Sequence, residues 1–292
     1  MIKPNFLIVG APKCGTTTLY SNLLKHPDIF LSPIKEPHFF GSDLSYSEFR
    51  QKANKYADLF GKTDKKVVGE ASTWYLYSKT AASEIRAYNP QMKIIIMLRN
   101  PVNAAFSLHS QALFSRNEVL SNFDDALNVE ELRLKGKAIP VCAHRTEALH
   151  YTEAYKYSQQ ISRFAANFKS SQILVIIFEE FINMPHKIMV DVCEFLGVDS
   201  KFQFQVGISN SRKKIRNHFI HKMIQKKNKR LTKLFPIIIR RQMHNLLKQL
   251  NSRKAESYEL SESVRNKLQE TFIKDIEKTE AILNLKLDDW KY

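Results

Sequence analysis

Four short apolar segments lie along the chain, each rich in isoleucine or valine and bounded by turn-forming or polar residues. Such runs are typical of strands that are buried on both faces of a parallel sheet. They are Phe6–Val9, Val67–Val68, Lys93–Leu98 and Ile173–Phe178. Helical patterns lie between them at Thr17–Lys25, Ser47–Phe60, Ser78–Tyr88, Val102–Arg116, Glu147–Phe168 and Pro185–Leu196. Strands that alternate with helices predict an α/β fold, a parallel sheet flanked by helices on both faces.

The C-terminal third contains no comparable strand. Two stretches there, Ile215–Leu250 and Ser261–Leu285, have the pattern of helices. No internal repeat and no low-complexity linker interrupts the 292 residues. A single domain over residues 1–292, with a helical basic C-terminal portion, is therefore the simplest organisation.

Positive charge is concentrated in one stretch. The formal net charge is +16, and Arg212–Lys254 holds 15 of the 45 Lys and Arg residues with no Asp or Glu. The rest of the chain has 45 − 15 = 30 basic against 29 acidic residues, so it is nearly neutral. Such a stretch attracts nucleic acid, anionic lipid, acidic glycans or an anionic cofactor, or it is a solvated helical face. The sequence leaves both interpretations open.

Composition excludes several classes of protein. A hydrophobic fraction of 43% is too high for a disordered chain. No segment approaches the roughly 20 apolar residues that span a bilayer, and the N-terminal apolar run is too short for a signal peptide, so we expect a cytoplasmic location. Three cysteines, Cys14, Cys142 and Cys193, are too few and too irregular for a disulfide scaffold or a zinc site.

A glycine-rich loop at residues 10–18 follows the first predicted strand and opens the first predicted helix. Backbone N–H groups and the helix dipole favour a phosphate in such a place. The loop reads Gly10-Ala-Pro-Lys13-Cys14-Gly15-Thr16-Thr17-Thr18. Thr16 stands where a Walker A motif has lysine, and the loop lysine is Lys13 instead. The third strand ends at Arg99-Asn-Pro without an Asp for magnesium, so a metal-bridged triphosphate is not expected.

This loop resembles the 5′-phosphosulfate loop of sulfotransferases that use 3′-phosphoadenosine 5′-phosphosulfate (PAPS). A second block, Leu98-Arg99-Asn-Pro-Val-Asn-Ala-Ala-Phe-Ser107, resembles the segment in which that family holds the 3′-phosphate with an arginine and a serine. The resemblance implies that PAPS is the donor, and that Arg99 and Ser107 bind its 3′-phosphate. It implies that Lys13 and the loop from Cys14 to Thr18 hold the 5′-phosphosulfate, with no metal ion.

Further stretches resemble Golgi-type glycan sulfotransferases, the heparan sulfate enzymes and their bacterial relatives. Lys35-Glu36-Pro-His38-Phe-Phe is similar to the segment that carries the catalytic glutamate of that family. Gly69-Glu70-Ala-Ser72-Thr-Trp-Tyr75 is similar to a substrate-facing segment, which implies acceptor contacts for Glu36, Glu70, Ser72 and Tyr75. Ala71 replaces a lysine of those relatives. The resemblance covers about residues 5–215, and it places Arg212 and Lys213 in a basic loop over the cofactor; residues 216–292 match nothing.

Sulfuryl transfer needs an oriented nucleophile, a base and positive charge at the leaving phosphate. Lys13 supplies charge, and Glu36 is the expected base, with a pKa raised by its aromatic neighbours. A surface ion pair between Glu36 and Lys35 is the structural alternative, and His38 and His109 are rival bases.

Two other functions stay open from the sequence. One is a nucleotide kinase with a degenerate phosphate loop. The other is a nucleic-acid or anionic-surface binding protein that uses residues 212–254, although no nucleic-acid motif is present. For a sulfotransferase, the expected acceptor is a hydroxyl or amine of a carbohydrate or small metabolite.

Overall fold

The computed structural model of the chain describes residues 2–45, 51–61, 63–205, 213–215, 252–254 and 260–291. The chain forms two compact units. One unit combines Met1–Ser209 with Ser261–Tyr292, and the other is Asn210–Leu260. The predicted single domain of residues 1–292 stays a prediction.

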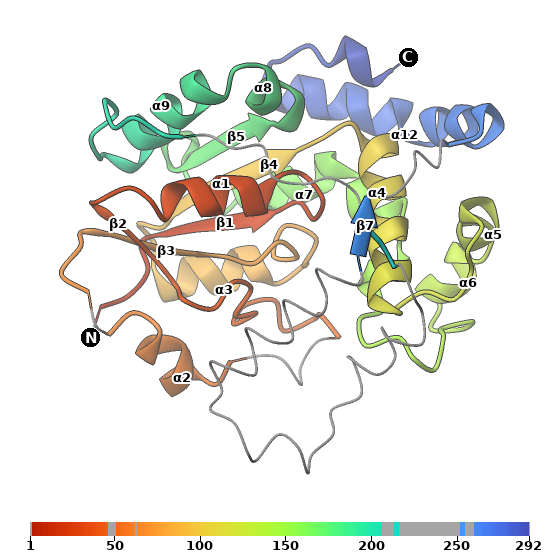
Figure 1. Cartoon of the computed structure of the whole chain (residues 1–292), viewed down its shortest axis with the longest axis horizontal. Coiled ribbons are helices and arrows are strands. Elements are labelled where there is room, and N and C mark those ends of the chain that lie inside the picture. The colour runs from red at the N-terminus through yellow and green to blue at the C-terminus, as the bar shows by residue number, and fades with distance from the viewer. Residues whose placement is uncertain are drawn as a thin grey trace. The chain divides into compact units, whose positions relative to one another are not determined.

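A parallel sheet of five strands forms the centre of the larger unit, in the order β2-β3-β1-β4-β5 (Figure 1). The strands are β1 Phe6–Gly10, β2 Ile29–Leu31, β3 Val67–Ala71, β4 Lys93–Leu98 and β5 Ile173–Ile177. Four of them were expected from their apolar runs. The strand β2 was missed, because three residues give no periodic signal.

The central strands pack tightly because both faces are covered. All five residues of β1 are buried, and Phe6 pairs with Gly69 of β3 on one side and Lys93 of β4 on the other. A Cβ on Gly69 would lie 2.4 Å from Phe6 Cε1. The glycine therefore makes room for the aromatic ring between adjacent strands.

Helices flank the sheet, which confirms the predicted fold class (Figure 1). The α-helices are α1 Thr16–Leu23, α2 Ala53–Asp58, α3 Ala81–Tyr88, α4 Pro101–Ser115, α5 Phe123–Asn128, α6 Glu130–Leu134, α7 Tyr157–Ala165, α8 Phe178–Asn183, α9 Pro185–Leu196 and α12 Glu262–Leu283. The short 3-10 turns are η1 Glu147–Leu149, η2 Glu153–Tyr155, η3 Ser170–Gln172 and η5 Asp288–Trp290.

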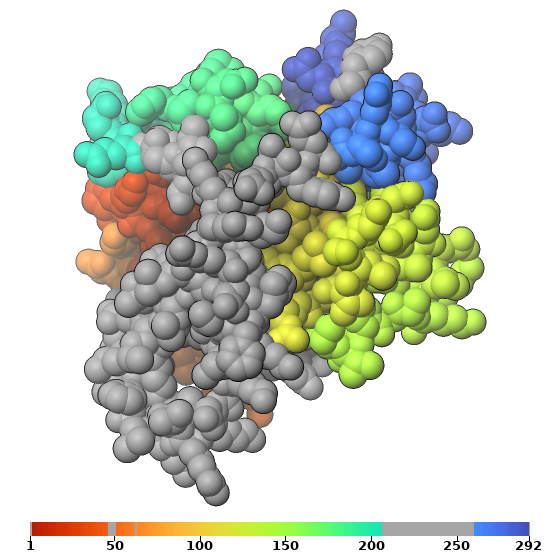
Figure 2. Space-filling view, turned by 45° about the vertical axis from the view of Figure 1, so that its right-hand side comes forward, coloured from red at the N-terminus to blue at the C-terminus, as the bar shows by residue number. Residues whose placement is uncertain are grey.

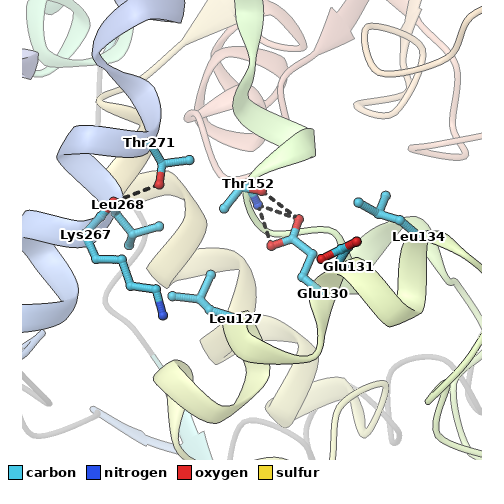
Figure 3. A pocket seen from close by; sticks show the side chains of 8 residues that line it. All are labelled: Leu127, Glu130, Glu131, Leu134, Thr152, Lys267, Leu268 and Thr271. Carbon is cyan, nitrogen blue, oxygen red and sulfur yellow. Dashed lines mark hydrogen bonds between the residues drawn. The ribbon is translucent and has the colours of Figure 1, made fainter.

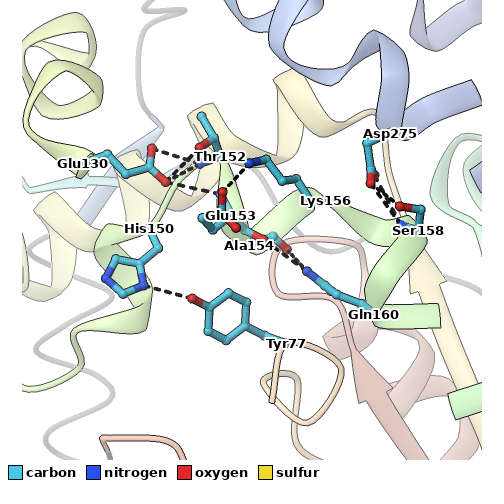
Figure 4. A network of polar contacts seen from close by, with 10 residues as sticks. All are labelled: Tyr77, Glu130, His150, Thr152, Glu153, Ala154, Lys156, Ser158, Gln160 and Asp275. Atoms are coloured by element: carbon cyan, nitrogen blue, oxygen red, sulfur yellow. Dashed lines mark hydrogen bonds and ion pairs between the residues drawn. The ribbon is translucent and has the colours of Figure 1, made fainter. Parts of the chain in front are cut away.

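The long helix predicted at Glu147–Phe168 is wrong, because two carboxylates from other elements interrupt it. Glu130 at the start of α6 accepts the backbone N–H of Thr152 at 2.8 Å. Asp275 of α12 accepts the backbone N–H of Ser158 at 3.3 Å (Figure 4). Each carboxylate satisfies an N–H group that a continuous helix would bond internally, so the segment forms η1, η2 and α7 in succession.

The C-terminal helix completes the larger unit. Figure 2 shows α12, in blue, against the segment from α4 to α6, in yellow and green, and Lys267 Nζ lies 3.0 Å from Asp124 Oδ1 of α5. The start of α12 is capped by Ser261, whose Oγ accepts the N–H of Val264 at 3.4 Å. The helix predicted at Ser261–Leu285 is thus confirmed with slightly shorter bounds.

In the smaller unit, β6 Lys213–Ile215 pairs antiparallel with β7 Ser252–Lys254. Residues 216–250 of the helix predicted at Ile215–Leu250 lie outside the described residues, and Ile215 itself ends β6 instead of starting a helix. Residues 47–50 of the helix predicted at Ser47–Phe60 also lie outside the described residues. Within the described ranges, no helix combines the length and apolar character that crossing a membrane requires.

Candidate donor and acceptor site

The residues singled out from the sequence gather at the carboxyl ends of the parallel strands. The glycine-rich loop follows β1, and Arg99 follows β4, its neighbour in the sheet. The two segments are joined where the Ala11 N–H donates to the Met97 carbonyl at 2.6 Å. After β1 the chain crosses toward β2, and after β4 it crosses toward β5, so this is the switch point where open α/β sheets bind ligands.

The loop has the backbone of an anion site. Gly15 adopts a φ of +86° just before α1, and none of the described side chains caps that helix. A Cβ on Gly15 would lie 2.7 Å from Phe178 Cδ2, so glycine is required for both conformation and space. Thr16 and Thr18 are buried, and Thr17 is exposed. A helix start that no described side chain caps suits a phosphate, as do nearby hydroxyl groups.

Lys13 lies inside the loop with a left-handed backbone, at a φ of 64°. Its Nζ donates to Gln111 Oε1 of α4 at 3.3 Å. Burial lowers the pKa of Lys13, and the neighbouring Arg99 charge lowers it further, while Glu36 acts in the opposite direction. The charges of both Arg99 and Glu36 therefore act on the Lys13 ammonium.

Cys14 fills the turn, as its small size suggests. It is fully buried, and its Sγ lies 3.6 Å from Tyr157 Oη. Tyr157 in turn donates to the Arg99 carbonyl at 2.9 Å, so the thiol is part of the packing behind the loop. Burial raises the pKa of the Cys14 thiol to about 12, which makes it a poor nucleophile.

Thiol modification of the native protein should distinguish the three cysteines. Cys142 is exposed, whereas Cys14 and Cys193 are buried, and burial raises the pKa of Cys193 to about 11. We expect Ellman's reagent to titrate one thiol in the native protein and all three after denaturation. Mass spectrometry should assign the native modification to Cys142; rapid modification of Cys14 would contradict the packing described for the loop.

Arg99 lies beside the loop, and Ser107 lies on the helix that follows Arg99. The Arg99 Nη1 donates to the Lys13 carbonyl at 3.3 Å, and its guanidinium carbon lies 4.6 Å from the ring centre of Phe178. Its Nε is buried and has no hydrogen-bond partner among the residues that the structure describes. A buried donor without a partner fits an anionic ligand group at this place. Ser107 lies on α4 and is 8% exposed.

Glu36 stands in the loop after β2, surrounded by polar partners. Its Oε1 accepts from Lys35 Nζ at 3.1 Å and from Thr73 Oγ1 at 3.2 Å. Its Oε2 lies 3.5 Å from His38 Nε2 and 3.8 Å from Arg145 Nη1. Burial raises the pKa of Glu36, but the charges of Lys35 and Arg145 and the hydrogen bond from Lys35 outweigh it, and the net pKa is lowered. The expected raised pKa is therefore wrong, because charged groups rather than aromatic rings surround the carboxylate.

His38 is buried beside Glu36 and faces Arg145. The Arg145 Nη2 lies 2.9 Å from His38 Nε2, and a guanidinium can only donate, so this ring nitrogen is the acceptor. Burial lowers the pKa of His38 to about 4, and the Arg145 charge contributes. His38 is thus neutral at physiological pH, with the lone pair of Nε2 already engaged.

His109, the other rival base, packs in a different place. It is buried on α4, with its Nε2 2.8 Å from the Leu120 carbonyl and its ring 4.9 Å from that of Phe123. Burial lowers the pKa of His109. These contacts describe a packed histidine between α4 and α5.

Glu70, Ser72 and Tyr75 lie beneath the Glu36 loop rather than at the surface. All three are fully buried. The Glu70 carboxylate accepts from Ser72 Oγ at 2.9 Å and from Tyr56 Oη at 3.4 Å. Burial raises the pKa of Glu70 to about 7. Direct contact with an acceptor stays a prediction for these residues, and their burial favours a supporting role.

Backbone strain is concentrated at the three expected catalytic residues. Six described non-glycine residues have a positive φ. Two of them, Arg116 and Asn284, end helices, and Ala138 lies in a connecting segment. The other three are Lys13, Glu36 and His38, with φ values of 64°, 61° and 53°. Left-handed backbone at non-glycine residues clusters at functional sites, where neighbouring structure holds it in place.

Two groups were missed by the sequence. Arg145 lies in an irregular segment with no motif, and only the fold brings it to Glu36 and His38. Gln111 lies four residues after Ser107 on α4, so helical spacing alone places it on the same face and provides a signal. The expected cofactor residue Arg212 lies outside the described residues, and Lys213 begins β6 of the smaller unit.

A separate cavity of about 200 Å³ lies between α5, α6 and α12 (Figure 3). Its lining includes Leu127, Glu130 and Leu268, and Figure 3 shows the Glu130 carboxylate bonded to Thr152. Because this carboxylate caps η2, the cavity is part of the helical packing and not of the site at the strand ends.

Comparisons with known proteins agree with this geometry. The profile of the sulfotransferase domain matches residues 3–282. Carbohydrate sulfotransferase 15 of Mus musculus is 33% identical over 147 residues, covering 36% of this chain and 26% of that protein. Human heparan sulfate glucosamine 3-O-sulfotransferase 3B1 is 28% identical over 196 residues, covering 67% of this chain and 46% of that protein. The chain thus spans less than half the length of these relatives.

A solved structure is similar over its whole length. The crystal structure of a sulfotransferase from Alicyclobacillus acidocaldarius has 28% sequence identity and a TM-score of 0.76, and the match covers 100% of both chains. The sheet and the helices that flank it therefore have the fold of a solved sulfotransferase.

Proposed function

The chain belongs to the sulfotransferase domain family, and from this premise we propose that it transfers a sulfuryl group from PAPS to a hydroxyl or amine of a carbohydrate or small metabolite. The observation that supports the proposal is the cationic group at the strand ends, where Arg99 Nη1 donates to the Lys13 carbonyl at 3.3 Å and the charge of Glu36 acts on Lys13. A cationic anion site and a carboxylate base in one space are what an in-line displacement at sulfur requires.

The residues present fit the two ends of the proposed donor. The uncapped start of α1 and Lys13 suit a 5′-phosphosulfate, and the unpartnered Nε of Arg99 suits a 3′-phosphate, with Ser107 on the neighbouring helix. When bound, PAPS supplies the activated sulfuryl group and a phosphate leaving group. Arg212 and Lys213 are proposed to add positive charge to the donor, as the resemblance implies.

We assign the base to Glu36. Its lowered pKa keeps the carboxylate ionised at neutral pH, so it can accept the proton of an attacking hydroxyl. His38 is less suited, because its Nε2 already accepts from Arg145. We propose that Arg145 orients the carboxylate instead, and that His38 holds the Arg145 guanidinium. Lys13 places its charge where the leaving phosphate develops negative charge.

The acceptor is proposed from the relatives and from the site. Carbohydrate and heparan sulfate sulfotransferases are among the similar proteins, which favours a glycan or a sugar-like metabolite. An ATP-dependent kinase is disfavoured, because Thr16 occupies the position of the Walker lysine. Binding of polyanions by residues 212–254 and the cytoplasmic location stay predictions.

Removing the Arg99 guanidinium should weaken binding of the 3′-phosphate and leave binding of the 5′-phosphate largely unchanged. We expect Arg99→Ala to weaken binding of adenosine 3′,5′-bisphosphate by about 10- to 100-fold, since a charge-assisted hydrogen bond contributes about 1.5–3 kcal/mol. Binding of adenosine 5′-phosphate should change far less. Isothermal titration calorimetry measures both, with Arg86→Ala of α3 as a control. Equal losses for the two nucleotides would remove Arg99 from this role.

A further inference from the structure

We propose that Glu70 is a positioning residue that holds the loop of Glu36 in its active conformation through two hydroxyl relays, Ser72 and Tyr75. The loop of residues 36–41 is called the base loop below. The inference rests on the proposed role of Glu36 as the base. It gives the buried residues Glu70, Ser72 and Tyr75, at the end of β3 and just after it, a role other than binding the acceptor.

The first relay runs from His38 through Ser72 to Glu70. The backbone N–H of His38 donates to Ser72 Oγ at 3.3 Å. The same hydroxyl donates to Glu70 Oε2 at 2.9 Å. The Ser72 hydroxyl therefore accepts a hydrogen bond from the base loop and donates one to the Glu70 carboxylate beneath it.

The second relay runs through Tyr75 in the same direction. Its Oη accepts the backbone N–H of Phe39 at 2.8 Å and that of Phe40 at 3.3 Å. The phenol hydrogen bonds to the Glu70 carboxylate. A tyrosine oxygen that accepts two N–H groups has only its proton left to give, so its partner must be an acceptor.

Both relays thus end on a group that must accept hydrogen bonds. A third hydroxyl, that of Tyr56, also donates to Glu70, at 3.4 Å, and its ring stacks on Phe39 at 4.1 Å between centres. Three donors converge on one carboxyl, and only the ionised form accepts from all of them without placing a proton of its own among them. A glutamine at this position would place an N–H₂ group among donors.

The base loop needs such support because its backbone is strained. Glu36 and His38 have left-handed φ values of 61° and 53°, and Gly41 follows with a φ of 81°. The N–H of Glu36 is held by the Ala71 carbonyl at 2.9 Å. The relays hold the N–H groups of His38, Phe39 and Phe40. Without these hydrogen bonds, nothing in the relays offsets the unfavourable backbone conformation of the loop. The Glu36 carboxylate then loses its position.

The relay also responds to pH. Burial raises the pKa of Glu70 to about 7, and the charge of Glu36 acts in the same direction, while Tyr75, Ser72 and Tyr56 donate to the carboxylate and oppose this rise. Above pH 7 the carboxylate accepts from all its partners. Below it, the added proton competes with the relay hydroxyls, so amide protection in the base loop should fall as the pH is lowered through 7.

Amide hydrogen exchange of the full chain tests the proposal directly. In Glu70→Gln, we expect the amides of His38, Phe39 and Phe40 to exchange about 10- to 100-fold faster than in the wild type. Ser72→Ala should affect the His38 amide, and Tyr75→Phe should affect those of Phe39 and Phe40. These two variants keep the test available if Glu70→Gln does not fold. Unchanged exchange in all three variants overturns the proposal.

Glu130→Gln is a matched control. Glu130 is also buried, burial raises its pKa to about 7 as well, and it accepts backbone N–H groups at η2 rather than in the base loop. Its substitution should leave exchange in residues 36–41 unchanged. Faster exchange of the base loop in this control would show a general loss of stability and would overturn the specific assignment to Glu70.

Turnover gives the second readout. Glu70→Gln should lower kcat by about 10- to 100-fold, leave the affinity for adenosine 3′,5′-bisphosphate unchanged, and remove the component of the pH profile near 7. If the wild type transfers no sulfuryl group, the proposed function fails while the exchange result still stands. If the wild type is active and Glu70→Gln retains normal kcat, the positioning role fails alone.

Discussion

Replacing Glu36 with glutamine is expected to lower the turnover of sulfuryl transfer by about 10²- to 10⁴-fold, the range that general-base catalysis contributes. Glutamine keeps the size of the side chain and can still accept from Thr73 and Lys35. It cannot take up the proton of the acceptor. Affinity for adenosine 3′,5′-bisphosphate should therefore remain close to that of the wild type in calorimetry, while steady-state transfer is lost.

The Glu36 assignment has a pH signature and a control. Because its cationic partners lower the pKa of Glu36, the acid limb of the pH profile that belongs to Glu36 should lie below the ordinary range of a carboxyl group, apart from the component near pH 7 assigned to Glu70. Lys35→Met removes one of those partners, so the acid limb of the pH profile should move to higher pH. Glu131→Gln, which breaks only an exposed ion pair with Lys135, should have no effect. Survival of activity in Glu36→Gln, together with a dead His38→Ala, would reassign the base.

Replacing Lys13 with alanine is expected to reduce turnover by about 10²- to 10³-fold, as removal of one preorganised donor to a developing negative charge does elsewhere. The ammonium of Lys13 is the only charged group that the loop from Gly10 to Thr18 contributes. Its hydrogen bond to Gln111 holds the side chain beside α4. Turnover should fall by a larger factor than the affinity for the donor, because the Lys13 charge contributes most when negative charge develops on the leaving phosphate.

Lys25→Ala is the control for Lys13→Ala. Lys25 follows the same helix, but its Nζ donates to the Gln205 carbonyl at 2.8 Å and is exposed. This variant should transfer sulfuryl groups at the wild-type rate. Near-normal transfer by Lys13→Ala would remove the loop lysine from catalysis and with it the assignment of the loop as a phosphosulfate site.

The parts of the site that follow directly from a strand could be predicted from the sequence. Lys13 and Arg99 leave the ends of β1 and β4, two apolar runs with clear signals, and adjacent parallel strands bring their ends together. Gly15 is recognised because it stands between a strand and a helix. Here local sequence and global fold agree.

The surroundings of Glu36 could not be predicted, because they depend on contacts between distant segments. Arg145 lies over a hundred residues from Glu36, in a stretch without motif or periodicity, yet it helps to reverse the expected direction of the pKa. From the sequence, Glu70 is predicted to contact the acceptor. A motif does not show whether a side chain at the end of a strand is buried, and Glu70 is buried in the structure. Similarly, Asp275 of α12 interrupts the predicted helix before α7.

The central claim is that the chain uses a donor with a 3′-phosphate for sulfuryl transfer. The most direct test incubates the wild type and a panel of glycan and small-metabolite acceptors with ³⁵S-labelled PAPS, and in parallel with labelled adenosine 5′-phosphosulfate, which lacks the 3′-phosphate. We predict label in the acceptor fraction from PAPS, in equal amount to the adenosine 3′,5′-bisphosphate released, and much less from the second donor. Equal transfer from both donors, or transfer from neither, would contradict the account.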